Sequence, residues 1–391
     1  MAAFPAQRAF LDAASGPLHP LAAQTMTAAV DAGWADPRRL YREGRQAAAL
    51  LNQARETIAA DLGVRPSELS FHFGGGPAAL TAALEGLAWP RRRAGSRLVA
   101  SAVEHSNVLI AGRYAVAQSG DPLRFAEIGV DRAGRVDLDA FAAALTDPTT
   151  AVAALQHANG EVGTMQPVDA AYRACAERGI PLLVDGQASV GRVRAPASYA
   201  ALVADAATVA GPPLGLLVVP ERTAFRRPGP PREAEFGRAD APVWVPLALA
   251  AAEAWQQAAA VRDDDAGSAR ALTDRIRAAA AAIPDVEVAG DDGERLPHIV
   301  TCSALYVDGE TLVGELDRRD IAVASGSACT ASTLEPSHVL AAMGLLTHGN
   351  IRITVPWRAT APDRDSGVDR LITALPLVIG EVRARLGAGG L

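Results

Sequence analysis

The sequence contains no lysine, since all 37 of its basic residues are arginines. On a solvated surface arginine replaces lysine at little cost, because both side chains are hydrated cations there. A guanidinium cannot, however, replace an amine as a nucleophile. The composition therefore excludes chemistry in which a lysine side chain forms an imine with a carbonyl group.

Cysteine, positive charge and long apolar runs are also scarce. Three cysteines, Cys175, Cys302 and Cys329, have no paired spacing, which favours a reducing, cytoplasmic setting over a disulfide framework. The formal net charge of −7 predicts no basic face for nucleic acid or an anionic membrane. No apolar run approaches the roughly 18 residues of a membrane span. The scattered histidines and the lack of a paired-cysteine motif predict no metal site.

What is present is a long alternation of strand and helix patterns. Strand-like runs cover 69–73, 97–103, 123–128, 151–156, 181–184 and 216–219, and helical patterns cover 50–62 and 168–178. This alternation predicts a largely parallel sheet covered by helices on both faces. An Arg/Pro/Gly-rich stretch over 226–232 is typical of a loop. From about Asp263 a different pattern begins, with an Ala-rich helix over 269–281 and strands near Val286 and Ile299, which predicts a smaller C-terminal domain.

The most specific motif is Ser325-Gly326-Ser327-Ala328-Cys329-Thr330, followed by Leu334-Glu335-Pro336-Ser337-His338. Small residues surround Cys329, and a cysteine thiolate is a competent nucleophile and sulfur acceptor. A structural cysteine is the alternative interpretation. The length of the surrounding motif favours a functional position over a structural one.

The order of such motifs resembles the class V aminotransferases, and specifically their cysteine desulfurase branch, which takes sulfur from L-cysteine with pyridoxal phosphate. The resemblance rests on 10–17, 74–80, 103–109, 157–168, 184–191, 324–345 and 350–355. It implies a fold-type I pyridoxal-phosphate transferase, an α/β fold whose large domain has a mainly parallel seven-stranded sheet between helices, with a smaller α+β C-terminal domain. The implied units are an N-terminal arm (1–15) that packs with the small domain, a large domain (16–254) and a small domain (255–391).

The resemblance also implies roles for individual residues. Cys329 corresponds to the cysteine that removes the substrate's sulfur as a persulfide, and Arg352 to the arginine that binds the substrate α-carboxylate through two parallel hydrogen bonds. His105 corresponds to the histidine that stacks on the pyridine ring, and Asp185 to the aspartate that keeps the ring nitrogen protonated. The other implied cofactor-binding residues are Asn159, Ser189, Gly75 and Gly76.

The family's lysine belongs to a Ser-Gly-His-Lys run followed by Gly-Pro-Lys-Gly, and this part of the sequence departs from it. If Gly211-Pro212 is matched with Gly-Pro, Thr208 replaces the lysine. If Ala210-Gly211 is matched with Ser-Gly, Pro213 replaces it, and this second alignment is the one we favour from sequence. Neither alignment supplies an amine.

Further departures remove polar contacts that the family makes with its cofactor. The changes affect both phosphate-binding threonines, an asparagine and a glutamine, which here are Gly76, Ala241, Gly160 and Ala188, although Gln187 stands next to the last. Gly74 to Pro77 still offer backbone N–H groups at a helix start, which suits an anion. All these losses have the same direction, toward weaker retention of the cofactor.

Two functional hypotheses follow. The first is a desulfurase-like protein that is degenerate for pyridoxal phosphate chemistry, accepts sulfur on Cys329 or has a regulatory role in sulfur transfer, and binds no cofactor covalently. The alternative is an active cysteine desulfurase or lyase that holds pyridoxal phosphate non-covalently. Expected partners are a second copy or a paralogue in a dimer, and an active desulfurase or a sulfur carrier, with L-cysteine as the family's substrate.

Overall fold

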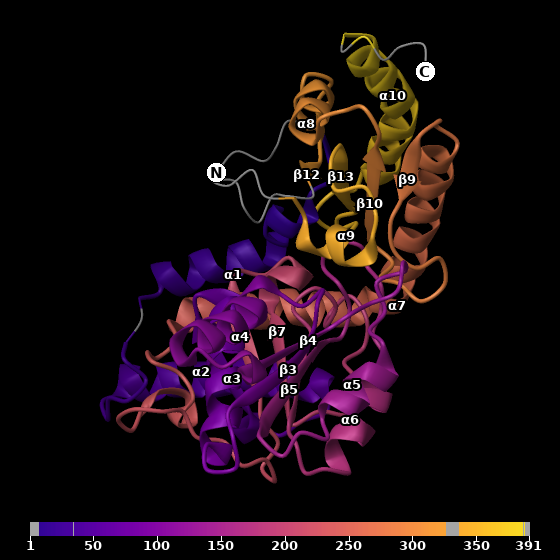
Figure 1. Ribbon diagram of the computed structural model, residues 1–391. Coiled ribbons are helices and arrows are strands. Elements are labelled where there is room, and N and C mark those ends of the chain that lie inside the picture. Colours follow the sequence, from indigo (N-terminus) through magenta and orange to yellow (C-terminus); the bar gives the residue numbers. More distant parts are fainter. Residues whose placement is uncertain (1–7, 34, 326–335, 386, 388–391) are drawn as a thin grey trace.

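The computed structural model describes residues 8–33, 35–325, 336–385 and 387. The chain builds a larger lower part and a smaller upper part in Figure 1, with the C-terminal helix α10 at the top. In the described chain, seven strands of the larger part form one sheet, in the order β2-β8-β7-β6-β5-β3-β4. Their bounds are β2 (Leu69–Phe73), β3 (Arg97–Ser101), β4 (Phe125–Ile128), β5 (Thr150–Gln156), β6 (Leu182–Asp185), β7 (Ala201–Asp205) and β8 (Leu214–Val218). Strand β8 is antiparallel to both neighbours, and the pairs from β7 to β4 are parallel.

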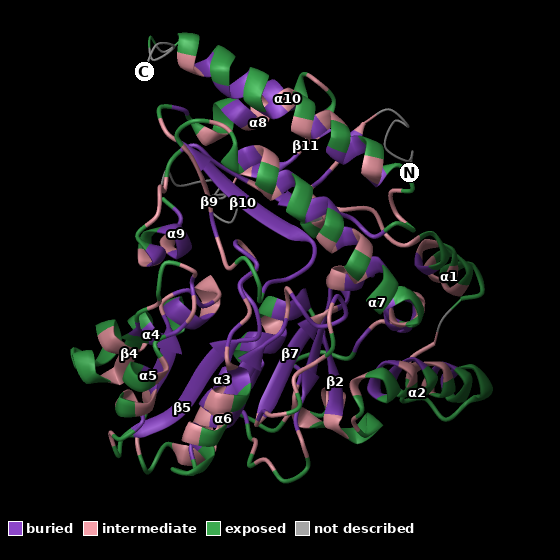
Figure 2. Ribbon diagram, turned by 90° about the vertical axis from the view of Figure 1, so that its right-hand side faces the viewer, coloured by how far each residue is buried: buried purple, intermediate pink, exposed green. Residues whose placement is uncertain are grey.

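Apolar residues alternate between the two faces of this sheet, as the twofold repeat of a strand requires. In β5, Ala153 and Leu155 join the core on one face, whereas Val152 and Ala154 join the core on the other. Helices cover both faces, and the inner strands are mostly buried, as their colouring in Figure 2 shows, whereas the edge strand β4 is largely half-buried or exposed. The mostly parallel α/β fold that the sequence predicts is therefore confirmed.

The ends of the two predicted helices of this part lie close to the predicted positions, but α2 begins at Arg42, eight residues before the predicted pattern. Helix α2 ends at Gly63, whose φ of 68° is the left-handed conformation that glycine adopts without strain at a helix end. Helix α6 ends a few residues before the predicted Gly179. The bounds are α1 (Pro20–Asp31), α2 (Arg42–Leu62), α3 (Gly75–Arg91), α4 (Ser106–Ser119), α5 (Leu138–Ala144) and α6 (Val168–Ala176).

The smaller part is built on an antiparallel sheet whose described strands follow the order β12-β13-β10-β9. Near it, strand β1 of the N-terminal segment pairs in parallel with β11. The strands are β1 (Ala9–Phe10), β9 (Val286–Val288), β10 (Ile299–Ala304), β11 (Ile321–Ala322), β12 (Ala324–Ser325) and β13 (Asn350–Thr354); the helices are α8 (Gly309–Asp317), α9 (His338–Met343) and α10 (Arg364–Arg385). A separate apolar cluster forms the core here, with Leu272 and Ile276 from helix α7 packed against β10 and α10.

Helix α7 (Val245–Ala281) joins the two parts and corrects one prediction. The sequence predicted a helix over 269–281, but the structure has one continuous helix of 37 residues. Its first half contributes Trp255 to the core of the larger part, and its second half packs in the smaller part. In the middle of this helix, Asp265 accepts a hydrogen bond from the buried guanidinium of Arg364 (Nη1–Oδ1 2.8 Å). Among the described residues, no helix is both long and apolar enough to cross a membrane.

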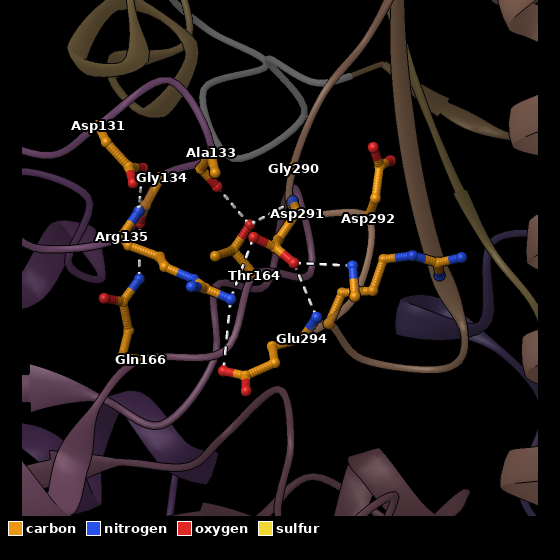
Figure 3. Close-up of polar contacts among 12 residues, drawn as sticks. Asp131, Ala133, Gly134, Arg135, Thr164, Gln166, Gly290, Asp291, Asp292 and Glu294 are labelled. Carbon is orange, nitrogen blue, oxygen red and sulfur yellow. Dashed lines mark hydrogen bonds and ion pairs between the residues drawn. The ribbon is translucent and has the colours of Figure 1, made fainter.

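A polar network also connects the two parts (Figure 3). The hydroxyl of Thr164 donates to the carbonyl of Ala133 (2.6 Å) and accepts from the backbone N–H of Asp291 (3.1 Å). Arg135 forms ion pairs with Asp291 (3.1 Å) and Glu294 (3.3 Å). The loop at 290–294 of the smaller part is thus fixed to two loops of the larger one.

Candidate functional site

Residues that line the candidate site follow the carboxyl ends of the parallel strands, which all meet at one edge of the sheet. Glu104 and His105 come shortly after β3, and Asn159 comes shortly after β5. Asp185 is the last residue of β6, and Asp205 is the last residue of β7. The sheet therefore brings together side chains that are up to about a hundred positions apart in the sequence.

A cavity of about 830 Å³ lies over this edge of the sheet, with the smaller part of the chain on its other side. The larger part lines it with His105, Asp185 and Thr208. The smaller part contributes Arg352 from β13 and His298. This is a cleft between two packed units, the usual place for a small-molecule site.

Asp185 is buried, and its carboxylate is already bound by the chain itself. The side-chain amide of Gln187 donates to both oxygens (3.0 Å each), and the backbone N–H of Gln187 donates to Oδ1 (2.9 Å). Burial raises the pKa of Asp185, and the charge of His105 opposes this. The carboxylate that the resemblance assigns to a ring nitrogen thus has an internal partner.

Helix α3 begins at the same edge, and its N-terminal N–H groups also have an internal partner. Gly76 donates its backbone N–H to Asp205 Oδ2 (2.5 Å). The other oxygen of Asp205 accepts the N–H of Ala207 (2.9 Å). Burial raises the pKa of Asp205, whereas these N–H groups and that of Leu214 lower it. A carboxylate therefore lies at the positive end of the helix, where an anion is most stable.

The glycine at position 76 and the placement of Gln187 are physically linked. A Cβ added at Gly76 would lie 2.6 Å from Cγ of Gln187 and closer still to its amide group. The side chain of Gln187 thus fills the space beside position 76, where the family has a threonine. Gly160 faces Ala188 in a similar way, with 3.2 Å between the Cβ of Ala188 and the position of a Cβ on Gly160.

Thr208 lies beside the cavity and Pro213 does not, so the structure agrees better with the alignment that places Thr208 at the lysine position than with the one that we favour from sequence. Thr208 lines the cavity, and its hydroxyl donates to the carbonyl of Gln187. Pro213 is exposed, immediately precedes β8, and is not among the described residues that line the cavity. Thr208 comes three residues after the end of β7, at the edge of the sheet that borders the cavity.

With Thr208 at the lysine position, the serine of the Ser-Gly-His-Lys run falls on Asp205. The aligned run then places Ala206 and Ala207 at the glycine and the histidine. Sequence reasoning missed the presence of Asp205 in the site and the contact between Gln187 and Asp185. The alignment anchored on Gly211-Pro212 carried the signal for Asp205, because it places a charged residue where the family has a small hydroxyl.

Two more buried carboxyl groups line the cavity. Burial and the nearby Asp185 raise the pKa of Glu104 to about 8. Its Oε1 accepts the backbone N–H of Gln156 (2.7 Å), and its Oε2 has no hydrogen-bond partner among the described residues. Burial raises the pKa of Glu161 to about 7, and Ser337 donates a hydrogen bond to it (2.6 Å).

The remaining predicted residues differ in what they contact. The Nδ1 of His105 accepts the N–H of Asn107 (3.1 Å) and caps helix α4, while its ring lines the cavity. Arg352 lies 3.9 Å from Asp12 in an ion pair, and its Nε has no hydrogen-bond partner in the described chain. Arg352 therefore contributes a positive charge to the cavity lining.

Other predicted cofactor contacts have structural roles here. Asn159 lines the cavity, but its amide donates to the carbonyl of Val103 (3.1 Å), and its oxygen accepts N–H groups of the following loop. Ser189 is fully buried against His157 (2.9 Å). Ser189, Gly75 and Gly76 are not among the described residues that line the cavity.

The cysteines divide into two groups. Cys329 lies outside the described residues. Cys175 and Cys302 are buried, and burial raises the pKa of each thiol to about 12. Because the thiolate is the nucleophile, these two thiols are poor sulfur acceptors at neutral pH.

Comparisons with known proteins agree with this geometry. Residues 9–211 and 230–365 match the family model described as aminotransferase class-V. A cysteine desulfurase of Nostoc sp. is 32% identical over 364 residues, which cover 90% of this chain and 87% of that protein. The IscS-like cysteine desulfurase of Mycobacterium tuberculosis is 32% identical over an alignment of 403 residues, which covers 98% of this chain and 99% of that protein. A solved NifS-like protein superposes with a TM-score of 0.84 at 21% identity, covering 96% of this chain and 100% of that one. The chain therefore belongs to the class-V aminotransferase family, on its cysteine desulfurase branch.

Proposed function

We propose that this protein is a desulfurase relative that has lost pyridoxal phosphate chemistry and takes part in sulfur transfer as an acceptor, with Cys329 as the acceptor thiol. The observation that carries the proposal is the absence of lysine from the whole sequence. Pyridoxal phosphate, the family's cofactor, acts through an imine with a lysine amine, and the hydroxyl of Thr208 cannot form one. The residues of this site therefore support no catalytic step through pyridoxal phosphate.

The acceptor step needs a sulfur donor, which we propose to be an active desulfurase or a sulfur carrier that bears a cysteine persulfide. The Cys329 thiolate attacks the outer sulfur of the donor. A sulfur–sulfur bond forms on Cys329, the donor's sulfur–sulfur bond breaks, and the donor leaves as a thiolate. The exchange requires no external oxidant or reductant. The raised pKa values of Cys175 and Cys302 support Cys329 as the competent thiol of the three.

The setting of this function is part of the proposal. A reducing, cytoplasmic environment would keep the acceptor thiol available. A dimer with a second copy or with a paralogue is expected from the family. The domain division expected from the family, at about residue 254, would fall within helix α7, so the two units would be rigidly connected rather than joined by a loop.

A persulfide transfer assay tests the proposal. The protein is incubated with an active desulfurase and isotopically labelled L-cysteine, and the persulfides are alkylated and located by peptide mass spectrometry. Label on Cys329 is expected, with loss of label in Cys329→Ser and no change in Cys302→Ser. An unlabelled wild-type protein would end the sulfur-acceptor proposal.

The alternative function is an active enzyme that holds pyridoxal phosphate non-covalently. One observation favours it, because His105, Asp185 and Arg352 all line the same cavity. Sulfide release from L-cysteine that rises with added pyridoxal phosphate, and exceeds the release by the free cofactor, would support it. The lost lysine contributes proton transfer as well as the imine, and general acid–base catalysis alone is worth about 10²–10⁴ in rate, so this reading predicts slow turnover.

A further inference from the structure

The floor of the cavity has two adjoining places that pyridoxal phosphate would need, and the chain itself fills both. The first is the start of helix α3, where Gly74 and Gly75 have φ values of 101° and 75°. This left-handed backbone turns the N–H of Gly76 toward the end of β7. The second is the carboxylate of Asp185 at the end of β6. An anion fits the first place, and a cationic ring nitrogen fits the second.

Asp205 closes the first place. Its Oδ2 lies 2.5 Å from the N–H of Gly76 and 2.9 Å from the position of a Cβ on Gly75. Because Oδ1 is bound to the N–H of Ala207, the carboxylate is fixed on both oxygens. A phosphate at the same helix end would have to displace this carboxylate or lie against a like charge.

Gln187 closes the second place. Its amide donates to both oxygens of Asp185 at 3.0 Å and so satisfies the carboxylate that a pyridinium would otherwise pair with. The side chain can lie there because position 76 is glycine, since a Cβ at Gly76 would overlap its Cγ and amide group. The loss of the family's threonine and the placement of Gln187 are thus one rearrangement.

We infer that Asp205 and Gln187 are internal replacements for the phosphate and the ring nitrogen of pyridoxal phosphate, and that they close this cavity to the cofactor even without a covalent bond. The inference rests on the proposed function and deepens it, because the missing lysine abolishes the imine whereas these two side chains exclude the free cofactor. The cavity beyond these two side chains stays open, and Arg352 still lines it.

Equilibrium dialysis with pyridoxal phosphate and with pyridoxal, which lacks the phosphate, tests the replacement by Asp205. The wild type is expected to bind the two equally weakly. Asp205→Ser, which restores the family's hydroxyl, is expected to favour pyridoxal phosphate by about tenfold or more, because the like charge is gone. Asp139→Ser, on the exposed first turn of α5, is the matched control and should behave as the wild type does.

Two results would overturn this part of the inference. One is a wild type that prefers pyridoxal phosphate by tenfold or more, and the other is an Asp205→Ser variant whose preference stays at one. If Asp205→Ser does not fold, Asp205→Asn keeps the shape and the acceptor oxygen without the charge, and the same two results decide. A wild type that binds the phosphate ester non-covalently overturns the inference but leaves the proposed loss of imine chemistry intact, so the two failures are distinguishable.

A double-mutant cycle tests the replacement by Gln187 without any ligand. Gly76→Thr is expected to lower the thermal midpoint of the wild type, because the new side chain collides with Gln187. In a Gln187→Ala background the same substitution should cost clearly less, since the space is then free. Equal losses in both backgrounds would show that the two positions do not compete for space and would overturn the assignment of Gln187.

Discussion

The buried carboxyl group of Glu104 makes a quantitative prediction about stability and pH. Burial and the nearby Asp185 raise its pKa from 4.5 to about 8 in the folded chain. Between these two values the folded protein holds a proton that the unfolded chain has released. The contribution of Glu104 protonation to the free energy of unfolding is therefore complete below about pH 4.5 and is lost above about pH 8. Between these values the free energy of unfolding falls by roughly 1.4 kcal/mol per pH unit.

Glu104→Gln is the informative perturbation. The amide keeps an acceptor oxygen for the N–H of Gln156, which lies 2.7 Å from Oε1, but it does not titrate. Equilibrium urea unfolding at pH 5.5 and 7.5 measures the difference. The wild type should lose about 2 to 3 kcal/mol more than the variant over this range.

The control is Glu127→Gln, at a surface carboxylate that pairs with Arg113 (3.1 Å) and is screened by solvent. It should follow the wild type at both pH values. Stability curves of wild type and Glu104→Gln that run parallel from pH 5.5 to 7.5 would refute the reasoning, because they would mean that Glu104 is ionised in both states.

Three further predictions concern the joint between the two parts and the register of the site. Asp265→Ala leaves two buried guanidinium groups without their carboxylate and should cost about 3 to 5 kcal/mol in urea unfolding, whereas Asp263→Ala, at an exposed ion pair on the same helix, should cost less than about 1 kcal/mol. Thr164→Val removes the hydroxyl that links the N–H of Asp291 to the carbonyl of Ala133 and should cost about 1 to 3 kcal/mol by the same assay. In an Asp205→Ser background, borohydride should trap an adduct of pyridoxal phosphate on the lysine of Thr208→Lys, while Pro213→Lys should give no specific adduct. Peptide mass spectrometry that finds the reverse would favour the alignment that places Pro213 at the lysine position.

Much of the fold could be predicted from the sequence because it depends on local patterns. The strand at 69–73 and the end of helix α2 at Gly63 agree with the predicted residues. Strand β7 was missed, since its residues 201–205 are followed closely by a short helical turn without a clear turn signal. Helix α7 was predicted too short because the ion pair that stabilises its middle joins Asp265 to a residue about a hundred positions away.

The sequence predicted part of the cavity lining but not its contacts, since Ser189, Gly75 and Gly76 are not among the described residues that line the cavity. His105, Asp185 and Arg352 line one cavity, as the resemblance implied. The carboxylate of Asp205 contacts a backbone N–H 129 positions earlier in the chain, and a sequence pattern does not reveal such a contact. The placement of Gln187, in the turn after β6, likewise depends on space freed at position 76 in helix α3, and these two residues are 111 positions apart in the sequence.

This chain has no side-chain amine with which to hold pyridoxal phosphate inside the cavity. The most direct measurement incubates the purified protein with pyridoxal phosphate, reduces it with borohydride and locates adducts by peptide mass spectrometry. We expect a reduced adduct at the N-terminal amine at most. We also expect sulfide release from L-cysteine to be no faster with the protein than with the free cofactor alone. A stable adduct within the chain, together with rapid cofactor-dependent sulfide release from L-cysteine, would contradict it.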